Sequence, residues 1–274
     1  MKSRIIMIVA GLVFSMGSYA FYYLFQSKNL ETPLNNSSPC YSLVAFGFPE
    51  FKKAQNGNIY MCHKAYAFEY NKDLKLSMWV VEHLKPTSIY GQVERTDEFM
   101  PDPKIPLFFS AKLEDYRGSG YDRGHLAPAA DFSKDIQAMG ESFYLTNMAP
   151  QVGIGMNRGV WREIESQVRK WVMARGDLYI ITGPVFMNGN SLGSIGKSNI
   201  PVPTHFYKVI IDKKSSQIMS FLVPNKDLRG QDVEDFIVSL SKIKQVTGLE
   251  FMPEAVDDRS KRYIINNIYK WEMN

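Results

Sequence analysis

Residues 115–131 read DYRGSGYDRGHLAPAAD, and this stretch decides how the rest of the sequence is interpreted. Its three glycines allow the backbone to turn sharply and to approach a ligand closely. In an extended conformation Arg123 and His125 face the same side of the chain. A guanidinium can hold a phosphoryl oxygen while a neutral imidazole removes a proton from water. Taken alone, the stretch fits a turn with a salt bridge and a packed histidine equally well.

A second stretch, residues 143–165, favours the catalytic interpretation. It reads FYLTNMAPQVGIGMNRGVWREIE. The Asp-Arg-Gly-His element, the Thr-Asn that precedes Pro-Gln, and the Asn that precedes Trp and Ile-Glu together resemble the DNA/RNA non-specific endonuclease family, which includes endonuclease G and secreted bacterial nucleases. The resemblance runs from about Phe46 to Phe251. It is specific because three separated motifs occur in the right order.

The resemblance implies a ββα-metal (His-Me finger) active site with four central roles. His125 matches the general base and Arg123 the arginine that stabilises charge on the phosphoryl oxygens. Asn157 matches the protein ligand of Mg²⁺, for which Mn²⁺ can substitute, and Glu165 matches the carboxylate that organises metal-bound water. Mg²⁺ prefers oxygen donors and keeps much of its hydration shell, so a single amide ligand suits it.

The family pattern also implies residues that support the site or bind substrate. These are Asn147, Arg169 and, by a looser match, Arg95. In a regular helix Asn157 and Glu165 would stand about 80° and roughly 12 Å apart, so a water-bridged role is expected for Glu165. Arg169 follows Glu165 by four residues, so the two are expected to pair.

The implied activity is hydrolysis of internal phosphodiester bonds in DNA and RNA, single- or double-stranded, to 5′-phosphate ends. Contacts to phosphates and sugars carry no base information, so no sequence preference is expected. Members of the family often form homodimers. Two other classes of function stay open: a catalytically idle nucleic-acid-binding protein at a membrane, and a hydrolase of other phosphodiesters.

The net charge of +4 is compatible with a polyanionic partner but does not predict one, because no concentrated basic block is present. Residues 1–28 predict a signal peptide or a membrane anchor, since Lys2 and Arg4 precede an uncharged apolar run. We therefore expect export to the periplasmic side of an inner membrane or secretion, with a mitochondrial location as the alternative. Residues 29–39 read as a linker, and residues 40–274 as one endonuclease domain.

The fold class predicted for this domain is α+β, with a central antiparallel sheet flanked by helices. The strongest helical pattern ends at Gly176, and a second helix is expected over residues 233–247. Cys40 and Cys62 are expected to form a disulfide if the domain is exported, the alternative being two buried thiols. Strand patterns of β-branched and aromatic residues cover residues 65–70, 77–82, 177–182, 204–211 and 217–223.

Overall fold

A computed structural model of the chain describes residues 39–44, 47–53, 57–253 and 271. The chain divides into two compact units, residues 1–33 and 34–274, and every described residue belongs to the second unit. The predicted leader lies outside the described residues, as does all but the last residue of the predicted linker. In the described part, no helix is both long enough and apolar enough to cross a membrane.

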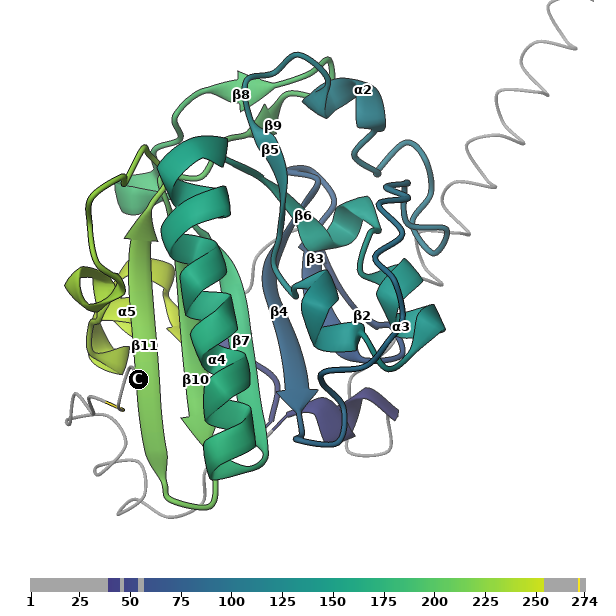
Figure 1. The fold of residues 1–274 in the computed structure, drawn as a ribbon. Helices are drawn as coiled ribbons and strands as arrows, with labels where there is room; N and C mark the ends of the chain where they lie inside the picture. The colour runs from purple at the N-terminus through teal and green to yellow at the C-terminus, as the bar shows by residue number, and fades with distance from the viewer. Residues whose placement is uncertain (1–38, 45–46, 54–56, 254–270, 272–274) are drawn as a thin grey trace, which may run out of the picture. The chain divides into compact units, whose positions relative to one another are not determined.

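A six-stranded sheet forms the centre of this unit (Figure 1). Every neighbouring pair of strands is antiparallel, and the inner strands are buried on both faces. The predicted α+β fold with a central antiparallel sheet is confirmed, and five of the strands lie where their residue pattern predicted them. Across the sheet the order is β11 (Gln217–Pro224), β10 (His205–Asp212), β7 (Leu178–Val185), β4 (Leu76–Leu84), β3 (Tyr66–Asn71) and β2 (Asn58–Cys62).

Smaller elements surround the sheet. Three short antiparallel pairs and two short helices are described, and one of the pairs carries the Asp-Arg-Gly-His element. The pairs are β1 (Glu50–Phe51) with β12 (Leu249–Glu250), β5 (Asp122–His125) with β6 (Met148–Gln151), and β8 (Ser194–Ile195) with β9 (Ile200–Pro201). The helices are α2 (Leu113–Tyr116) and α3 (Ile136–Glu141).

The longest helix among the described residues, α4 (Arg162–Arg175), ends as its sequence predicted. Gly176 adopts a φ of +98°, a conformation that glycine reaches without steric cost, and its N–H donates to the carbonyl of Val172. The second predicted helix is wrong in extent. The chain instead forms a 3₁₀ turn over Val233–Phe236 and a separate helix α5 (Leu240–Thr247).

The break before α5 has a local cause. Ile237 forms a β-bridge with Phe221 of β11, and the N–H of Val238 donates to the carbonyl of Ser220 (3.0 Å). The Ser239 hydroxyl then accepts from the backbone of the first turn of α5, as a serine N-cap does. Residues 237–239 therefore bond to the edge of the sheet, which prevents the helical pattern from continuing.

The two faces of β10 contact different layers because alternate residues of a strand point in opposite directions. Phe206 packs on Trp161 at the entrance to α4, with ring centroids 5.9 Å apart. Tyr207 belongs to the core on the other face, together with Leu240 and Ile243 of α5. Figure 1 shows α4 lying across β10 and β7, with α5 behind β11.

A disulfide joins Cys40 and Cys62, which confirms the pairing predicted from the sequence. It ties the 3₁₀ turn Pro39–Leu43 to the end of β2, with the two Cα atoms 5.9 Å apart. The bond closes a loop over a sequence separation of 22 residues. On the chain-entropy estimate, a loop of this length stabilises the fold by about 3 kcal/mol.

Candidate active site

The Asp-Arg-Gly-His element forms strand β5, and β6 and a helix follow it to complete a ββα unit. His125 pairs with Met148 and Asp122 with Gln151. β6 leads into an irregular π-type segment, Gly153–Trp161, which continues as α4. The π-type segment contacts β5. Residues that are 32 positions apart, His125 and Asn157, are thereby brought to neighbouring elements.

Gly124 is required in β5 by close packing. A Cβ atom at this position would run into the side chain of Gln151, which is fully buried on the partner strand. The glycine therefore lets β5 approach the Gln151 side chain without a clash, one residue before His125.

His125 is buried, with 9% of its surface exposed, and sits between two aromatic rings. Its ring contacts Phe143 edge to face at 5.1 Å and Phe99 at 5.7 Å. Burial, together with the positive charges of Arg95 and Arg123, lowers the pKa of His125 to about 3. The imidazole is therefore neutral at physiological pH and able to accept a proton. Its Nε2 atom has no hydrogen-bond partner among the described residues.

The two arginines lie on the same pair of rings. The guanidinium of Arg123 is 4.1 Å from the centre of the Phe99 ring, and that of Arg95 is 4.8 Å from the centre of the Phe143 ring. Arg95 also pairs with Asp97 at 2.7 Å. Cation–π contacts hold both charges beside His125. No local pattern indicated the two phenylalanines, because only the fold brings them against the histidine.

Asn157 is oriented by Asp122. The Asn157 amide nitrogen donates to Asp122 Oδ2 at 2.9 Å, and Arg158 Nε donates to the same oxygen at 3.0 Å. A carboxylate only accepts, so the amide must turn its nitrogen to Asp122 and its carbonyl oxygen away. A Cβ at Gly153 would collide with both Arg158 and Asp122. The glycine therefore leaves room for the ion pair between these two side chains. The free oxygen of Asn157 is a suitable ligand for a hard cation.

The regular-helix geometry expected between Asn157 and Glu165 does not hold. Gly159 has φ −117° and ψ −115°, far from helical values, and α4 starts only at Arg162. The angle and rise of an ideal helix therefore cannot be applied across this kink. The rotation and distance derived for a regular helix therefore do not describe this pair.

Arg169 pairs with a different carboxylate from the one expected. Its Nη1 donates to Asp131 Oδ1 at 2.8 Å, and Asp131 is almost fully buried. Glu165 acts on Arg169 through its charge. The predicted pairing with Glu165 is therefore corrected: Asp131 lies after β5 in the 3₁₀ turn Ala129–Phe132, and local helix spacing could not reveal it.

Glu165 is half-buried and interacts with the buried charges of Asp131 and Lys208. Burial and the nearby Asp131 raise the pKa of Glu165 to about 7, while Lys208, Arg169 and Arg95 oppose this shift. Lys208 of β10 is buried and donates to Thr182 Oγ1 at 2.7 Å. Glu165 is therefore close to equal populations of the protonated and ionised forms at neutral pH.

Asn147 lies under the site and bonds only to backbone. Its Oδ1 accepts from the Ala127 N–H (2.9 Å), and its Nδ2 donates to the carbonyls of Ala127 and Ser142 (2.8 Å each). The side chain is completely buried. These bonds fix the chain just after His125, which makes Asn147 a positioning residue; its amide groups are turned inward to the backbone.

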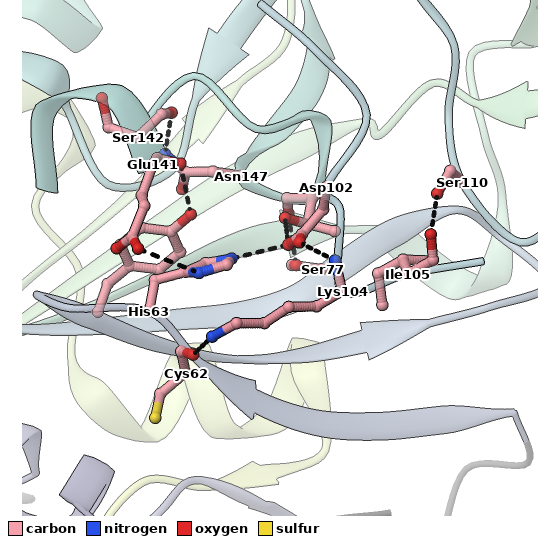
Figure 2. A network of polar contacts seen from close by, with 12 residues as sticks. Cys62, His63, Ser77, Asp102, Lys104, Ile105, Ser110, Glu141, Ser142 and Asn147 are labelled. Carbon is pink, nitrogen blue, oxygen red and sulfur yellow. Dashed lines mark hydrogen bonds and ion pairs between the residues drawn. The ribbon is translucent and has the colours of Figure 1, made fainter. Parts of the chain in front are cut away.

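Figure 2 shows the polar network that continues from this turn. His63 Nε2 lies 2.7 Å from Asp102 Oδ2, and Thr146 Oγ1 donates to the same oxygen at 2.8 Å. The backbone N–H of Lys104 donates to the other oxygen of Asp102, and the Lys104 ammonium donates to the carbonyl of Cys62. The network fastens the segment that follows Phe99 to the end of β2. His63 is buried inside this network, so its contacts give it a structural role.

A residue that the sequence did not indicate, Asn225, holds the turn before Asn157. Its Oδ1 accepts from the Val152 N–H (2.8 Å), and its Nδ2 donates to the carbonyls of Pro150 (3.0 Å) and Pro203 (2.9 Å). The side chain is buried, so these three bonds are shielded from water. Asn225 follows β11, far along the chain, and no local pattern links it to the site.

A cavity of about 580 Å³ opens beside these residues. Four arginines line it against one carboxylate, which makes it suited to a polyanion. Arg123 and Asn157 both reach it, so the predicted charge-stabilising and metal-binding residues share one space. His125 is not in the lining; its ring contacts Phe99, which is. The lining is formed by Arg95, Phe99, Leu113, Tyr116, Arg117, Gly118, Tyr121, Asp122, Arg123, Asn157 and Arg158.

A neutral buried histidine, an outward amide oxygen and an arginine-lined cavity on a ββα unit are the features of a nuclease. Residues 46–258 match the family model described as DNA/RNA non-specific endonuclease. The chain belongs to this family, which confirms the family and the class of enzyme that the motifs predicted.

Relatives and a solved structure agree with this assignment. The mitochondrial nuclease EXOG of Homo sapiens is 35% identical over 250 residues, covering 84% of this chain and 66% of its own length. Nuclease C1 of Cunninghamella echinulata var. echinulata is 35% identical, covering 77% of this chain and 87% of its own. A chain in the crystal structure of the EndoG/EndoGI complex superimposes with a TM-score of 0.72 at 32% identity, covering 80% of this chain and 94% of its own.

Proposed function

We propose that this protein hydrolyses internal phosphodiester bonds of DNA and RNA, with His125 as general base and a metal ion held by Asn157, and leaves 5′-phosphate ends. The observation that carries the proposal is the neutral His125 beside a cavity that Arg123 and Asn157 both line. Family membership supports the nuclease class. The chain spans slightly less than two thirds of human EXOG, so its own activity is inferred from the site.

The protein groups divide the chemistry between them. His125 takes a proton from the attacking water, because burial keeps its imidazole neutral. Arg123 and Arg95 balance charge that builds on the phosphoryl oxygens. Glu165 orients a water molecule near Asn157, and its pKa of about 7 lets it accept or release a proton at neutral pH. Arg169 forms an ion pair with Asp131, and its positive charge supports substrate binding.

The donor set fits Mg²⁺, with Mn²⁺ as a substitute. Among the described residues no three His, Cys, Asp or Glu side chains gather to hold a metal, and Asn157 offers one neutral oxygen. An ion bound through one amide keeps most of its water ligands, which Mg²⁺ favours. When bound, the ion supplies positive charge that stabilises the departing 3′-oxygen.

The proposed lack of sequence preference follows from the lining. Arginines are well suited to phosphates, and phosphate contacts carry no base information. Affinity should therefore fall with salt, with a slope of about −0.9 per phosphate contact on duplex DNA. Asn147 contributes indirectly, because it holds the turn after His125 from within the core.

The test is plasmid nicking and RNA cleavage by the purified protein with Mg²⁺ and with EDTA. His125→Ala should remove activity, whereas His205→Ala, a histidine at the start of β10, should retain it. Wild-type activity in His125→Ala would eliminate the assigned base. Binding without cleavage by the wild type would favour the idle nucleic-acid-binding alternative, and cleavage of a small diester with inert DNA would favour the other hydrolase.

The predicted leader is proposed to carry the domain across a membrane. Export was the first expectation from the sequence, but several relatives, human EXOG among them, are named mitochondrial nucleases, which supports the mitochondrial destination. Fractionation of cells that express the full chain with a C-terminal tag distinguishes the two. Membrane attachment through residues 1–28 and a homodimer stay predictions from the sequence; carbonate extraction and light scattering test them.

A further inference from the structure

A second cavity of about 540 Å³ lies where the end of β4 meets the turn Ala129–Phe132 and helix α3. Buried apolar side chains, Leu84, Phe132 and Ala138, contribute to its wall. Three exposed lysines also line it: Lys64, Lys85 and Lys134. The catalytic assignment uses none of these lysines.

The charges around this cavity are not balanced. Lys64 pairs with Asp135 at 2.6 Å, and His83 lies 3.3 Å from Asp177. Asp131, the other carboxylate in the lining, forms an ion pair with Arg169. Within the described ranges, the ammonium groups of Lys85 and Lys134 have no carboxylate within ion-pair distance. Two uncompensated positive charges over an apolar wall suit a phosphate-bearing ligand with an apolar portion.

A short segment links this cavity to the catalytic one. Ser88 lines the second cavity and Arg95 the first. Between them the N–H groups of Gly91 and Val93 donate to Ser133 (2.8 Å each), which lies next to Lys134. Seven residues span at most about 25 Å. This upper limit corresponds to at most about seven nucleotides at the spacing of roughly 3.4 Å per nucleotide found in a duplex.

An exposed aromatic ring lies along this segment. Tyr90 is 57% exposed and has a φ of +55°, a conformation that costs a non-glycine residue about 1–2 kcal/mol. Its phenol group is near enough to influence Arg169, the partner of Asp131 in the cavity wall. Exposed aromatic rings beside cationic side chains are the platforms on which single-stranded bases stack.

We propose that Tyr90, Lys85 and Lys134 form an outlying subsite that holds the substrate strand several nucleotides away from the bond that is cut. Phosphates contact the two lysines and a base stacks on Tyr90. The proposal rests on the proposed nuclease function and adds to it a dependence on substrate length. A tetranucleotide bound at the catalytic cavity is expected to end short of the outlying subsite, whereas a 20-nucleotide strand engages both regions.

The first measurement is binding of labelled single-stranded DNA in EDTA, by fluorescence anisotropy, to wild type and to Lys85→Ser/Lys134→Ser. Each phosphate contact on a single strand contributes about 0.7 to the salt slope, so losing two should lower the slope by about 1.4 and weaken binding of the 20-mer by about 25-fold at 0.1 M salt. Binding of the 4-mer should not change. Lys214→Ser/Lys242→Ser removes the same charge elsewhere and should match wild type.

The second measurement compares KM and kcat for cleavage of the two oligonucleotides. The lysine pair and Tyr90→Ala should raise KM for the 20-mer only and leave kcat unchanged, while Tyr90→Phe retains the wild-type KM. Equal changes in KM for the 4-mer and the 20-mer, or no change in either, would overturn the proposed subsite. Absence of cleavage by wild type would instead refute the proposed function, and the binding comparison in EDTA would still decide on the subsite.

Discussion

Gly124→Ala tests whether close packing between β5 and β6 sets the position of His125. The backbone of Gly124 does not have a positive φ, so alanine can adopt its conformation. The added methyl group would, however, overlap the side chain of Gln151, which is fully buried. Overpacking of this kind typically costs about 1–3 kcal/mol. We expect a loss of about 2 kcal/mol, or roughly 4–8 °C in Tm for a domain of this size.

Truncating Gln151 removes the side chain that the new methyl group would hit, and this second substitution provides the control. Neither polar atom of the Gln151 side chain has a hydrogen-bond partner among the described residues, so Gln151→Ala removes no such bond. In Gly124→Ala/Gln151→Ala the new methyl group gains the space that the glutamine leaves. The double variant should therefore be no less stable than Gln151→Ala alone, and a double-mutant cycle should give a coupling of about 2 kcal/mol.

The assay is denaturant unfolding of the four proteins, paired with plasmid nicking. Because a displacement of about 1 Å can cost about 100-fold in rate, Gly124→Ala should lose activity that the double variant recovers in part. Additive losses of stability in the double variant would refute the packing argument. They would show that the glycine is needed for another reason.

Asn225→Ala removes three buried hydrogen bonds before the π-type segment that carries Asn157, and each bond contributes about 1 kcal/mol. Because Asn157 would then be held less firmly, the Mg²⁺ concentration for half-maximal cleavage should rise. An unchanged metal titration would contradict this positioning role. His125 should stay neutral at pH 5 in metal-free protein, since its pKa is about 3; an NMR titration with a midpoint near 6.5 would be inconsistent with its burial. The pKa of Glu165 is about 7 in the folded protein and 4.5 in the unfolded chain. Between these two pH values the native state therefore binds more protons than the unfolded state. Stability should fall as pH rises from about 4.5 to 7, and Glu165→Gln should reduce that slope; equal slopes by urea unfolding would argue against the raised pKa. Reducing the Cys40–Cys62 disulfide should lower stability by about 3 kcal/mol, as measured by urea unfolding with and without reductant, and equal midpoints would show that it contributes little.

Much of the sheet could be read from the chain because it depends on local pattern. The strand over residues 205–212 alternates between two apolar faces, and α4 ends at a glycine with positive φ. Such features are decided by residues within a few positions of one another. The helix expected over residues 233–247 fails for the opposite reason, since Ile237 and Val238 bond to β11 at the sheet edge.

The sequence by itself determined the family and five strands of the central sheet, and it pointed to the candidate catalytic residues, because Asp-Arg-Gly-His, Asn157 and Glu165 stand at characteristic positions along the chain. Only the tertiary structure decided their surroundings: the rings of Phe99 and Phe143 on His125, Asp131 as the partner of Arg169, and the kink at Gly159. These contacts join segments far apart in the chain. Burial and charge at such contacts set the pKa of His125 and of Glu165, and no local pattern encodes them.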